Sequence, residues 1–289
     1  MVYKTNYKKR PAVAVDCGKF KAVFLPYDGA KLASLCTLEG KELLEQAKGE
    51  EYLRLGLDSD YVSCECSAFD DMFPTVDPCE INGRKYLDHG EVCRRTHLMT
   101  LEESKVSFLC KADEVGAFFK KTAYSKNGAL IIDYEIENTL NEPLPYIWAG
   151  HIMFAGRAGA CAFDNFPKSA ETVTMFGNPP KNRYIGELEV FSVSGESYKY
   201  YYTSSNVPLS CGVYYPDTGE KTVVSFEGDT VKYLGVWMNN GSFKGMHNIA
   251  LEPCTAPFDS PIRAQNAGKC SYIAPKSTVK FTFKLEYIK

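Results

Sequence analysis

Apolar and polar residues alternate along most of the chain, which is typical of strands that have one solvated face. Segments rich in Val, Ile, Phe, Tyr and Thr occupy residues 105–113, 129–138, 222–239 and 279–288. Residues 198–205 form a further, aromatic run. Two shorter alternating runs lie within residues 13–32, with a turn at Asp28-Gly29. Strand-like segments recur every 8–12 residues or so, and this spacing predicts an all-β protein built as a large antiparallel β-sandwich.

Helical patterns are few. Residues 41–55 (KELLEQAKGEEYLRL) predict a short helix, and residues 58–64 fit either a helix or a loop. No fixed-period repeat, low-complexity stretch or linker rich in Gly and Pro divides the chain. We therefore expect residues 1–289 to form a single β-sandwich domain with few short helices.

Composition narrows the classes of partner. The 289 residues are 45% hydrophobic and 24% charged with a net charge of -3, which suits a globular protein and excludes a disordered chain. A near-neutral chain lacks the basic field that binds nucleic acid and the polybasic patch that binds a membrane surface. The basic N-terminal stretch is not followed by an apolar segment of signal-peptide length, so we expect a cytoplasmic protein.

The 11 cysteines are scattered, mostly singly, as free thiols are in a reducing compartment. Cys64, Cys66, Cys79 and Cys93 raise the alternative of a zinc site. Only one tight pair exists among them, and a C-x-C pair on a strand places both thiols on one face, where they pack as small apolar groups. We therefore expect no metal.

Two of the four histidines have distinctive surroundings. His151 lies in WAGHIMFAG beside Trp148, and its imidazole would suit a general acid at a sugar site; the alternative is a hydrogen-bonded core histidine. His89 lies in the turn-like sequence Asp88-His89-Gly90, where it would donate a hydrogen bond to a substrate hydroxyl with Arg94 nearby, or else sit in a solvated loop.

Glu252 follows Ile-Ala-Leu and precedes a proline. A strand end that delivers a carboxylate into a half-buried pocket would raise its pKa, as a general base requires, whereas the alternative is an exposed carboxylate at a turn. Most of the aromatic residues belong in a core, but Trp148 and Trp237 are candidates to stack on the apolar face of a sugar ring.

Five segments, in order over nearly the whole chain, resemble the aldose 1-epimerase (galactose mutarotase-like) family. The most specific is 136–156 (IENTLNEPLPYIWAGHIMFAG), where a strand ends in Glu-Asn-Thr, a turn carries an acidic-Pro pair, and a histidine follows with an aromatic residue three positions on. The other four segments are LPYDGAKLASL (25–35), FDDMFPTVDP (69–78), NGRKYLDHGEVCRR (82–95) and YLGVWMNNGSFKGMHNIALEPCTAPFDSP (233–261).

The resemblance implies a large antiparallel β-sandwich and an isomerase of carbohydrate metabolism that interconverts the α and β anomers of an aldohexose or its phosphate without metal or organic cofactor. Glu252 would then take the proton of the anomeric hydroxyl, and His151 would protonate the ring oxygen. His89 would hold a hydroxyl or the ring oxygen, and Arg94 would anchor a further oxygen or an anionic group.

The sequence departs from the family pattern at three points. Ile152 follows His151 where the family commonly has proline, and Asp88 precedes His89 where the best-known mutarotases have a His-Gly-Gly sequence. For the aspartate that binds sugar hydroxyls in those enzymes, Asp71 and Asp164 are the candidates. These departures indicate a divergent member of the family, and the sequence does not identify its sugar.

Three functions compete. The first is a mutarotase or related hexose epimerase, and the second is a hexose-6-phosphate 1-epimerase in which Arg94 and Arg95 bind the phosphate. The third is a non-catalytic carbohydrate-binding protein on the same fold. Catalysis requires that Glu252 and His151 converge on one cleft, so their placement distinguishes the third function from the first two. Polysaccharide cleavage is less favoured for a cytoplasmic chain.

Overall fold

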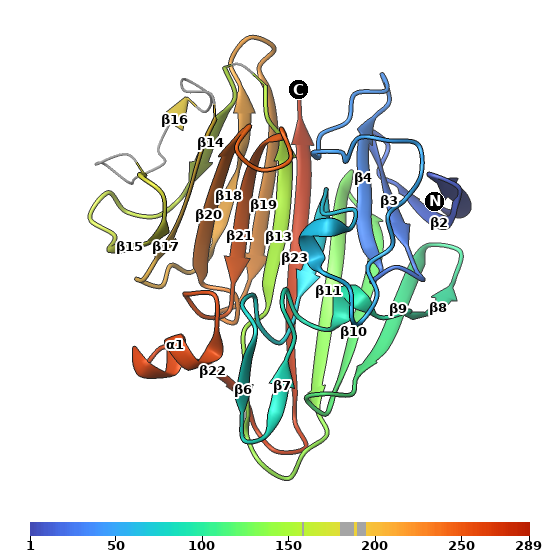
Figure 1. The fold of residues 1–289 in the computed structure, drawn as a ribbon. Helices are drawn as coiled ribbons and strands as arrows, with labels where there is room; N and C mark the ends of the chain where they lie inside the picture. Colours follow the sequence, from blue (N-terminus) through green and yellow to red (C-terminus); the bar gives the residue numbers. More distant parts are fainter. Residues whose placement is uncertain (158, 180–187, 190–194) are drawn as a thin grey trace.

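Two large antiparallel sheets lie face to face in the computed structural model, which describes residues 1–157, 159–179, 188–189 and 195–289 (Figure 1). One sheet has ten strands in the order β1-β2-β3-β4-β5-β13-β21-β20-β17-β15. The other has nine strands in the order β16-β14-β18-β19-β23-β11-β10-β9-β8. The architecture is therefore the predicted all-β sandwich.

The strands of the ten-stranded sheet are β1 (Val2–Tyr7), β2 (Arg10–Asp16), β3 (Phe20–Leu25), β4 (Lys31–Thr37), β5 (Phe69–Met72), β13 (Ala149–Ala155), β15 (Thr172–Phe176), β17 (Glu196–Tyr202), β20 (Tyr233–Asn240) and β21 (His247–Cys254). The strands of the nine-stranded sheet are β8 (Leu98–Leu101), β9 (Lys105–Ala112), β10 (Ala117–Lys126), β11 (Ala129–Asn138), β14 (Cys161–Asp164), β16 (Leu188–Glu189), β18 (Ser210–Tyr215), β19 (Glu220–Glu227) and β23 (Thr278–Ile288).

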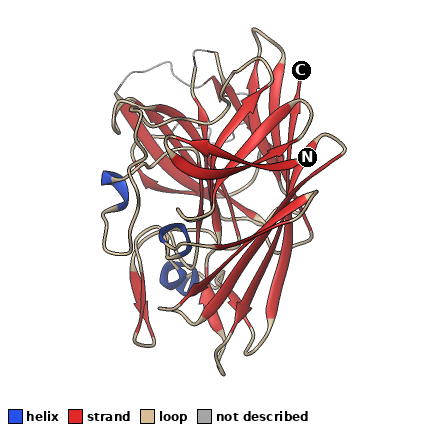
Figure 2. Ribbon diagram, turned by 90° about the vertical axis from the view of Figure 1, so that its right-hand side faces the viewer, coloured by secondary structure: helices blue, strands red, loops and turns tan. Residues whose placement is uncertain are grey.

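Short elements complete the described part of the chain. Two small ribbons pair β6 (Cys79–Ile81) with β7 (Arg84–Tyr86) and β12 (Leu144–Tyr146) with β22 (Ser271–Ile273). The helices are two single-turn 3-10 helices, η1 (Tyr61–Ser63) and η2 (Val92–Arg94), and the α-helix α1 (Pro261–Asn266). Figure 2 shows how little helix there is beside the strands.

The alternation of apolar and polar residues in the sequence determines which side chains form the core between the sheets. In β23, for example, Phe281, Phe283 and Leu285 are buried between the sheets while the residues between them are less buried. The other predicted strand segments also form strands: 105–113 contains β9, 129–138 is β11, 198–205 overlaps β17, and 222–239 spans most of β19 and β20.

The helix predicted at residues 41–55 is absent, and that prediction was wrong. Glu42 and Leu44 instead form isolated bridges to β4 and β13. The Glu42 carboxylate accepts hydrogen bonds from the backbone N–H groups of Leu35, Leu43 and Leu44. Because the sheet edge and this carboxylate satisfy the local backbone, and Leu43 and Leu44 are buried, tertiary packing overrides the helical propensity.

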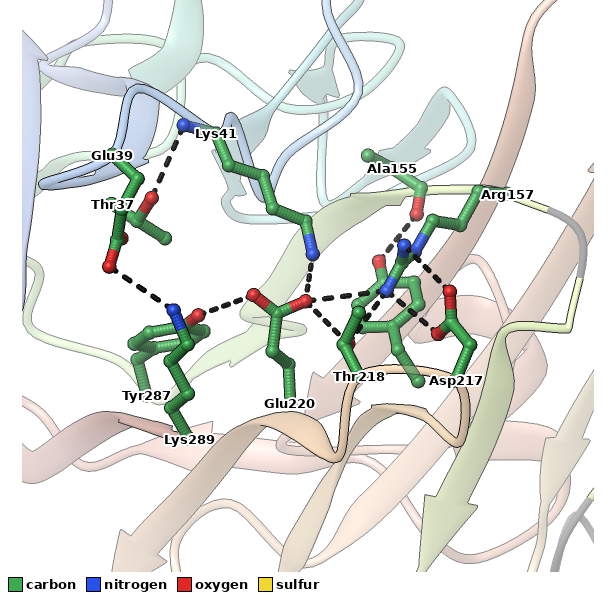
Figure 3. A network of polar contacts seen from close by, with 11 residues as sticks. Thr37, Glu39, Lys41, Ala155, Arg157, Asp217, Thr218, Glu220, Tyr287 and Lys289 are labelled. Atoms are coloured by element: carbon green, nitrogen blue, oxygen red, sulfur yellow. Dashed lines mark hydrogen bonds and ion pairs between the residues drawn. The ribbon is translucent and has the colours of Figure 1, made fainter.

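A polar network joins the two sheets near the start of β19 (Figure 3). The buried carboxylate of Glu220 pairs with Lys41, which follows β4, and with Arg157, which follows β13. Its other oxygen accepts a hydrogen bond of 2.7 Å from the hydroxyl of Tyr287 in β23. Arg157 also pairs with Asp217. The network therefore holds the ends of strands from both layers together.

The cysteines form no disulfide bond. Cys64 and Cys66 lie in a loop rather than on a strand, and they belong to a cluster of buried apolar residues that includes Met72 of β5 and Tyr201 of β17. No helix within the described residues is long and apolar enough to cross a bilayer.

Candidate active site

One transverse row of residues crosses five neighbouring strands of the ten-stranded sheet, in the order β5, β13, β21, β20 and β17. Figure 1 shows β13, β21, β20 and β17 side by side. Asp70 lies opposite His151, and Gly235 lies opposite Glu252 on one side and Tyr201 on the other. The pairs on either side of His151 set it opposite Glu252. The antiparallel register therefore aligns side chains that are about 180 residues apart in sequence.

This row points away from the core between the sheets. Successive residues of a strand face opposite sides, and the next residues along these strands, such as Ile152, Leu251 and Val236, belong to the buried inter-sheet cluster. Loops cover the outer face around the row and leave a cleft of about 300 Å³. The cleft is lined by Tyr61, Val62, Cys66, Val76, Asp77, His89, His151, Met175, Phe176, Lys199, Trp237, Phe243, Glu252, Asp259 and Arg263.

Glu252 is fully buried at the floor of the cleft, and its two oxygens differ. Oε2 lies 3.0 Å from Nζ of Lys199 and 3.3 Å from the hydroxyl of Tyr201. Oε1 has no hydrogen-bond partner among the residues that the structure describes, and it lies 3.6 Å from Nε2 of His151. Burial raises the pKa of Glu252, and the Lys199 ammonium opposes that rise.

His151 is also buried, and its environment keeps the imidazole neutral. Burial lowers the pKa of His151 well below its ordinary value, and the electrostatic effects of His89 and Lys199 act in the same direction. Its Nδ1 has no hydrogen-bond partner within the described ranges. The ring centroid lies 5.6 Å from that of Trp237, whose Nε1 is buried and has no hydrogen-bond partner in the described part of the chain.

His89 approaches the same cleft from the loop after β7. Its backbone is in the left-handed region (φ 57°), and its ring stacks on Tyr61 with centroids 3.8 Å apart and planes 4° from parallel. The Tyr61 hydroxyl donates a hydrogen bond of 2.8 Å to Asp70, which Lys31 also contacts at 2.6 Å. The ring centroids of His89 and His151 are 6.4 Å apart. A buried ion pair thus fixes the support on which His89 rests.

Several cleft residues were not predicted from the sequence. Lys199 lies 2.7 Å from Asp259 Oδ1, and the Tyr201 hydroxyl lies 2.8 Å from the same oxygen. Asp77 and Arg263 also line the cleft. Lys199 alternates with the core-facing tyrosines of β17, so the one cation in the aromatic run 198–205 was the signal available in the sequence.

Arg94 lies outside the cleft. Its guanidinium donates hydrogen bonds to backbone carbonyls at residues 56, 57, 59, 88 and 90, so it holds two loops together. Arg95 pairs with Glu91 and Asp113. Neither arginine is placed to anchor a ligand in this cleft, contrary to the sequence-based interpretation.

Asp71 and Trp148 face the opposite side of the sheet. Asp71 lies 2.6 Å from Nζ of Lys121 and accepts a hydrogen bond of 3.1 Å from the indole of Trp148, all three residues being buried. Asp164, the other aspartate considered, accepts a hydrogen bond of 2.9 Å from the Tyr202 hydroxyl. Because Asp70 faces the cleft side of β5, its neighbour Asp71 must face the core.

No protein-family model matches the chain, and no curated protein matches it either. Solved structures do. A galactose mutarotase-like protein from Clostridium acetobutylicum is 13% identical with a TM-score of 0.72, covering 100% of this chain and 98% of the other. A galactose mutarotase related enzyme from Lactobacillus acidophilus is 14% identical with a TM-score of 0.67, covering 100% and 98%.

A galactose mutarotase-like protein from Lactobacillus casei is 16% identical with a TM-score of 0.66, covering 96% of this chain and 100% of the other. At these identities the likeness establishes the fold. The chain has the galactose mutarotase-like fold over essentially its whole length, and this confirms the architecture that the resemblance implied.

Proposed function

We propose that this protein is a sugar isomerase that interconverts the α and β anomers of a hexose by general acid/base ring opening. One observation carries the proposal: a buried carboxylate oxygen that has no hydrogen-bond partner among the described residues, Oε1 of Glu252, lies 3.6 Å from Nε2 of His151 in an open cleft. The galactose mutarotase-like fold supports the same reaction class.

Glu252 is the general base of the proposed reaction. Its unpartnered Oε1 accepts the proton of the anomeric hydroxyl, while Lys199 and Tyr201 hold Oε2. A raised pKa brings the carboxylate closer to the working pH, where a base is most effective. Positioned proton transfer of this kind typically contributes about 100- to 10,000-fold in rate.

His151 delivers the proton to the ring oxygen. Because burial keeps this imidazole neutral, the proton that it delivers comes from the pair itself. Glu252 takes the proton from the anomeric hydroxyl, and Nε2 of His151 relays it to the ring oxygen as the C1–O5 bond breaks. The 3.6 Å between Oε1 and Nε2 is longer than a hydrogen bond, so this relay requires the two atoms to move closer when the sugar binds. The chain opens, the C1–C2 bond rotates, and the reverse steps close the other anomer with no net change in protons.

The remaining cleft residues suit a saccharide. Trp237 and Phe243, whose ring centroids are 5.6 Å apart, offer apolar surface to the face of a sugar ring. His89, Asp77 and Asp259 supply hydrogen-bonding groups for its hydroxyls. Arg94 and Arg95 have other partners, so recognition of a phosphorylated hexose would fall to Arg263, which lines the cleft.

Polarimetry and anomer-resolved NMR on a panel of freshly dissolved aldoses test the proposal. We expect the protein to accelerate equilibration of at least one aldose, and Glu252→Gln and His151→Ala each to lose about 100-fold or more. The matched controls Glu137→Gln and His247→Ala alter exposed residues outside the cleft and should retain full activity. A folded Glu252→Gln variant with normal activity contradicts the role of Glu252. Sugar binding without acceleration favours the non-catalytic carbohydrate-binding alternative.

A further inference from the structure

We propose that Lys199 is a positioning residue for Glu252, which anchors Oε2 so that Oε1 alone faces the substrate. This inference rests on the proposed function. It starts from an asymmetry within the described part of the chain: the oxygen near Lys199 contacts Lys199 and Tyr201, whereas the oxygen near His151 has no hydrogen-bond partner there. A carboxylate free to rotate would present either oxygen to the cleft, whereas an anchored one presents a single oxygen.

The fold places Lys199 for this task. It lies two residues before Tyr201 on β17 and therefore shares its face of the sheet. Its ammonium lies 3.0 Å from Glu252 Oε2 and 2.7 Å from Asp259 Oδ1. Asp259 is itself fixed, because its backbone carbonyl accepts hydrogen bonds of 3.0 and 2.6 Å from the backbone N–H groups of Val76 and Asp77. The ammonium thus bridges a rigid loop and the proposed base.

Charge favours the same role. The groups that face Glu252 are Lys199 and Tyr201 from β17, His151 from β13, His89 from the loop after β7, and Asp259 from the loop before α1. Of these described groups, Lys199 is the one with a permanent positive charge. Asp259 opposes it by raising the pKa of Glu252. The two neighbours therefore push the ionisation of Glu252 in opposite directions.

Lys199 does not act as an amine nucleophile toward the open-chain aldehyde. The adjacent carboxylates of Asp259 and Glu252 raise the pKa of Lys199 further above its ordinary value, although burial acts the other way. An ammonium has no lone pair to attack a carbonyl carbon. Its part is to orient Glu252 and to keep it ionised.

The pH dependence of kcat/KM separates this role from a merely structural one. Lys199→Met leaves two carboxylates facing each other, so the acid limb should move up by about 1–3 pH units, and kcat should fall more than KM rises. Asp259→Asn removes the repulsive charge, so its acid limb should move down. Lys199→Arg keeps the cation, and its limb should stay close to that of the wild type.

Carbon-13 NMR of the Glu252 carboxyl, assigned by its loss in Glu252→Gln, gives the same comparison without turnover. The midpoint of the pH titration of this carboxyl should lie at a higher pH in Lys199→Met, and at a lower pH in Asp259→Asn, than in the wild type. Thermal unfolding confirms that each variant is folded. Should Lys199→Met fail to fold, Asp259→Asn alone must still lower the midpoint.

Coincident midpoints in folded wild type and Lys199→Met overturn the inference, as does an Asp259→Asn midpoint that does not fall. If no aldose is turned over but the midpoints separate as stated, the proposed reaction fails while the control of Glu252 by Lys199 stands. If mutarotation occurs and the midpoints coincide, the reaction stands and Lys199 is only structural.

Discussion

The ring of Tyr201 occupies the space that a side chain at Gly235 would fill: a Cβ added at Gly235 would lie 2.6 Å from Cε1 of Tyr201 and 3.2 Å from Cβ of Glu252. Gly235→Ala should therefore displace Tyr201 and the carboxylate of Glu252. We expect about 1–3 kcal/mol of destabilisation from overpacking. A shift on the order of 1 Å at the base would lower kcat/KM about 100-fold. Thermal unfolding and polarimetry measure the two effects.

Gly56→Ala is the matched control. A Cβ at Gly56 would meet only the flexible hydroxyl of Ser59, at 3.2 Å, and Gly56 does not line the cleft. Activity close to that of the wild type is expected there. If the two glycine variants lose activity equally, the loss does not come from contact with Tyr201 and Glu252.

The pH profile of kcat/KM should have an acid limb and no basic limb between about pH 6 and 9. Activity falls on the acid side as Glu252, with its raised pKa, takes up a proton and ceases to be a base. His151 is already neutral in this range because its pKa is lowered, so raising the pH removes no proton from it. If kcat/KM declines as the pH rises from 6 to 7, the acid is a preformed imidazolium, and the proton relay is contradicted.

Tyr61 supports His89 through its ring and Asp70 through its hydroxyl. Tyr61→Leu removes the stacked ring and should weaken sugar binding by about 0.5–1.5 kcal/mol, measured by calorimetry. Tyr61→Phe keeps the ring, so its binding should remain near the wild-type value. It loses the hydrogen bond to a buried carboxylate and should unfold more easily. Equal affinities in the two variants would show that stacking does not position His89.

Glu220 should stabilise the sandwich through the network in Figure 3. The hydrogen bond from Lys41 is the main cause that lowers the pKa of Glu220 to about 2. A lowered pKa means stability that is present above the unfolded-state pKa of about 4.3 and lost as the pH falls toward 2. Glu220→Gln should cost about 1–3 kcal/mol near pH 7.

The difference between Glu220→Gln and the wild type should shrink below about pH 4, as urea titrations at several pH values would reveal. Glu39→Gln provides the control, since this exposed carboxylate in the same network contacts Lys289 at the surface. It should leave the unfolding midpoint unchanged. A cost for Glu220→Gln that is constant from pH 7 to 3 contradicts the ionic role.

The period of two predicted the strands well because the sandwich buries alternate residues, as β11 and β23 illustrate. The helix expected at residues 41–55 did not form, since the edge of β4 and the Glu42 carboxylate supply hydrogen bonds that no local pattern reveals. The local sequence pattern therefore predicted the strands of the two sheets, but it did not predict where the irregular segment 41–55 packs.

The residues of the candidate site could be predicted from the sequence only in part, for the same reason. Glu252, His151, His89 and Trp237 reach one cleft. Arg94 and Asp71 do not, because each is satisfied by buried partners that lie far away in sequence or on the other face of a strand. Lys199 and Asp259 meet only through the pairing of β17 with β20 and the docking of the loop before α1.

The proposed proton-transfer groups sit on the sheet, whereas much of the surface around them comes from loops. Adjacent strands are held about 4.8 Å apart by their ladder of hydrogen bonds, so the spacing between base and acid is a property of the scaffold itself. Insertions in the covering segments would then change which sugar is admitted while reactivity is preserved. The sheet thus fixes the proposed proton-transfer groups, and the loops set the selectivity for the sugar.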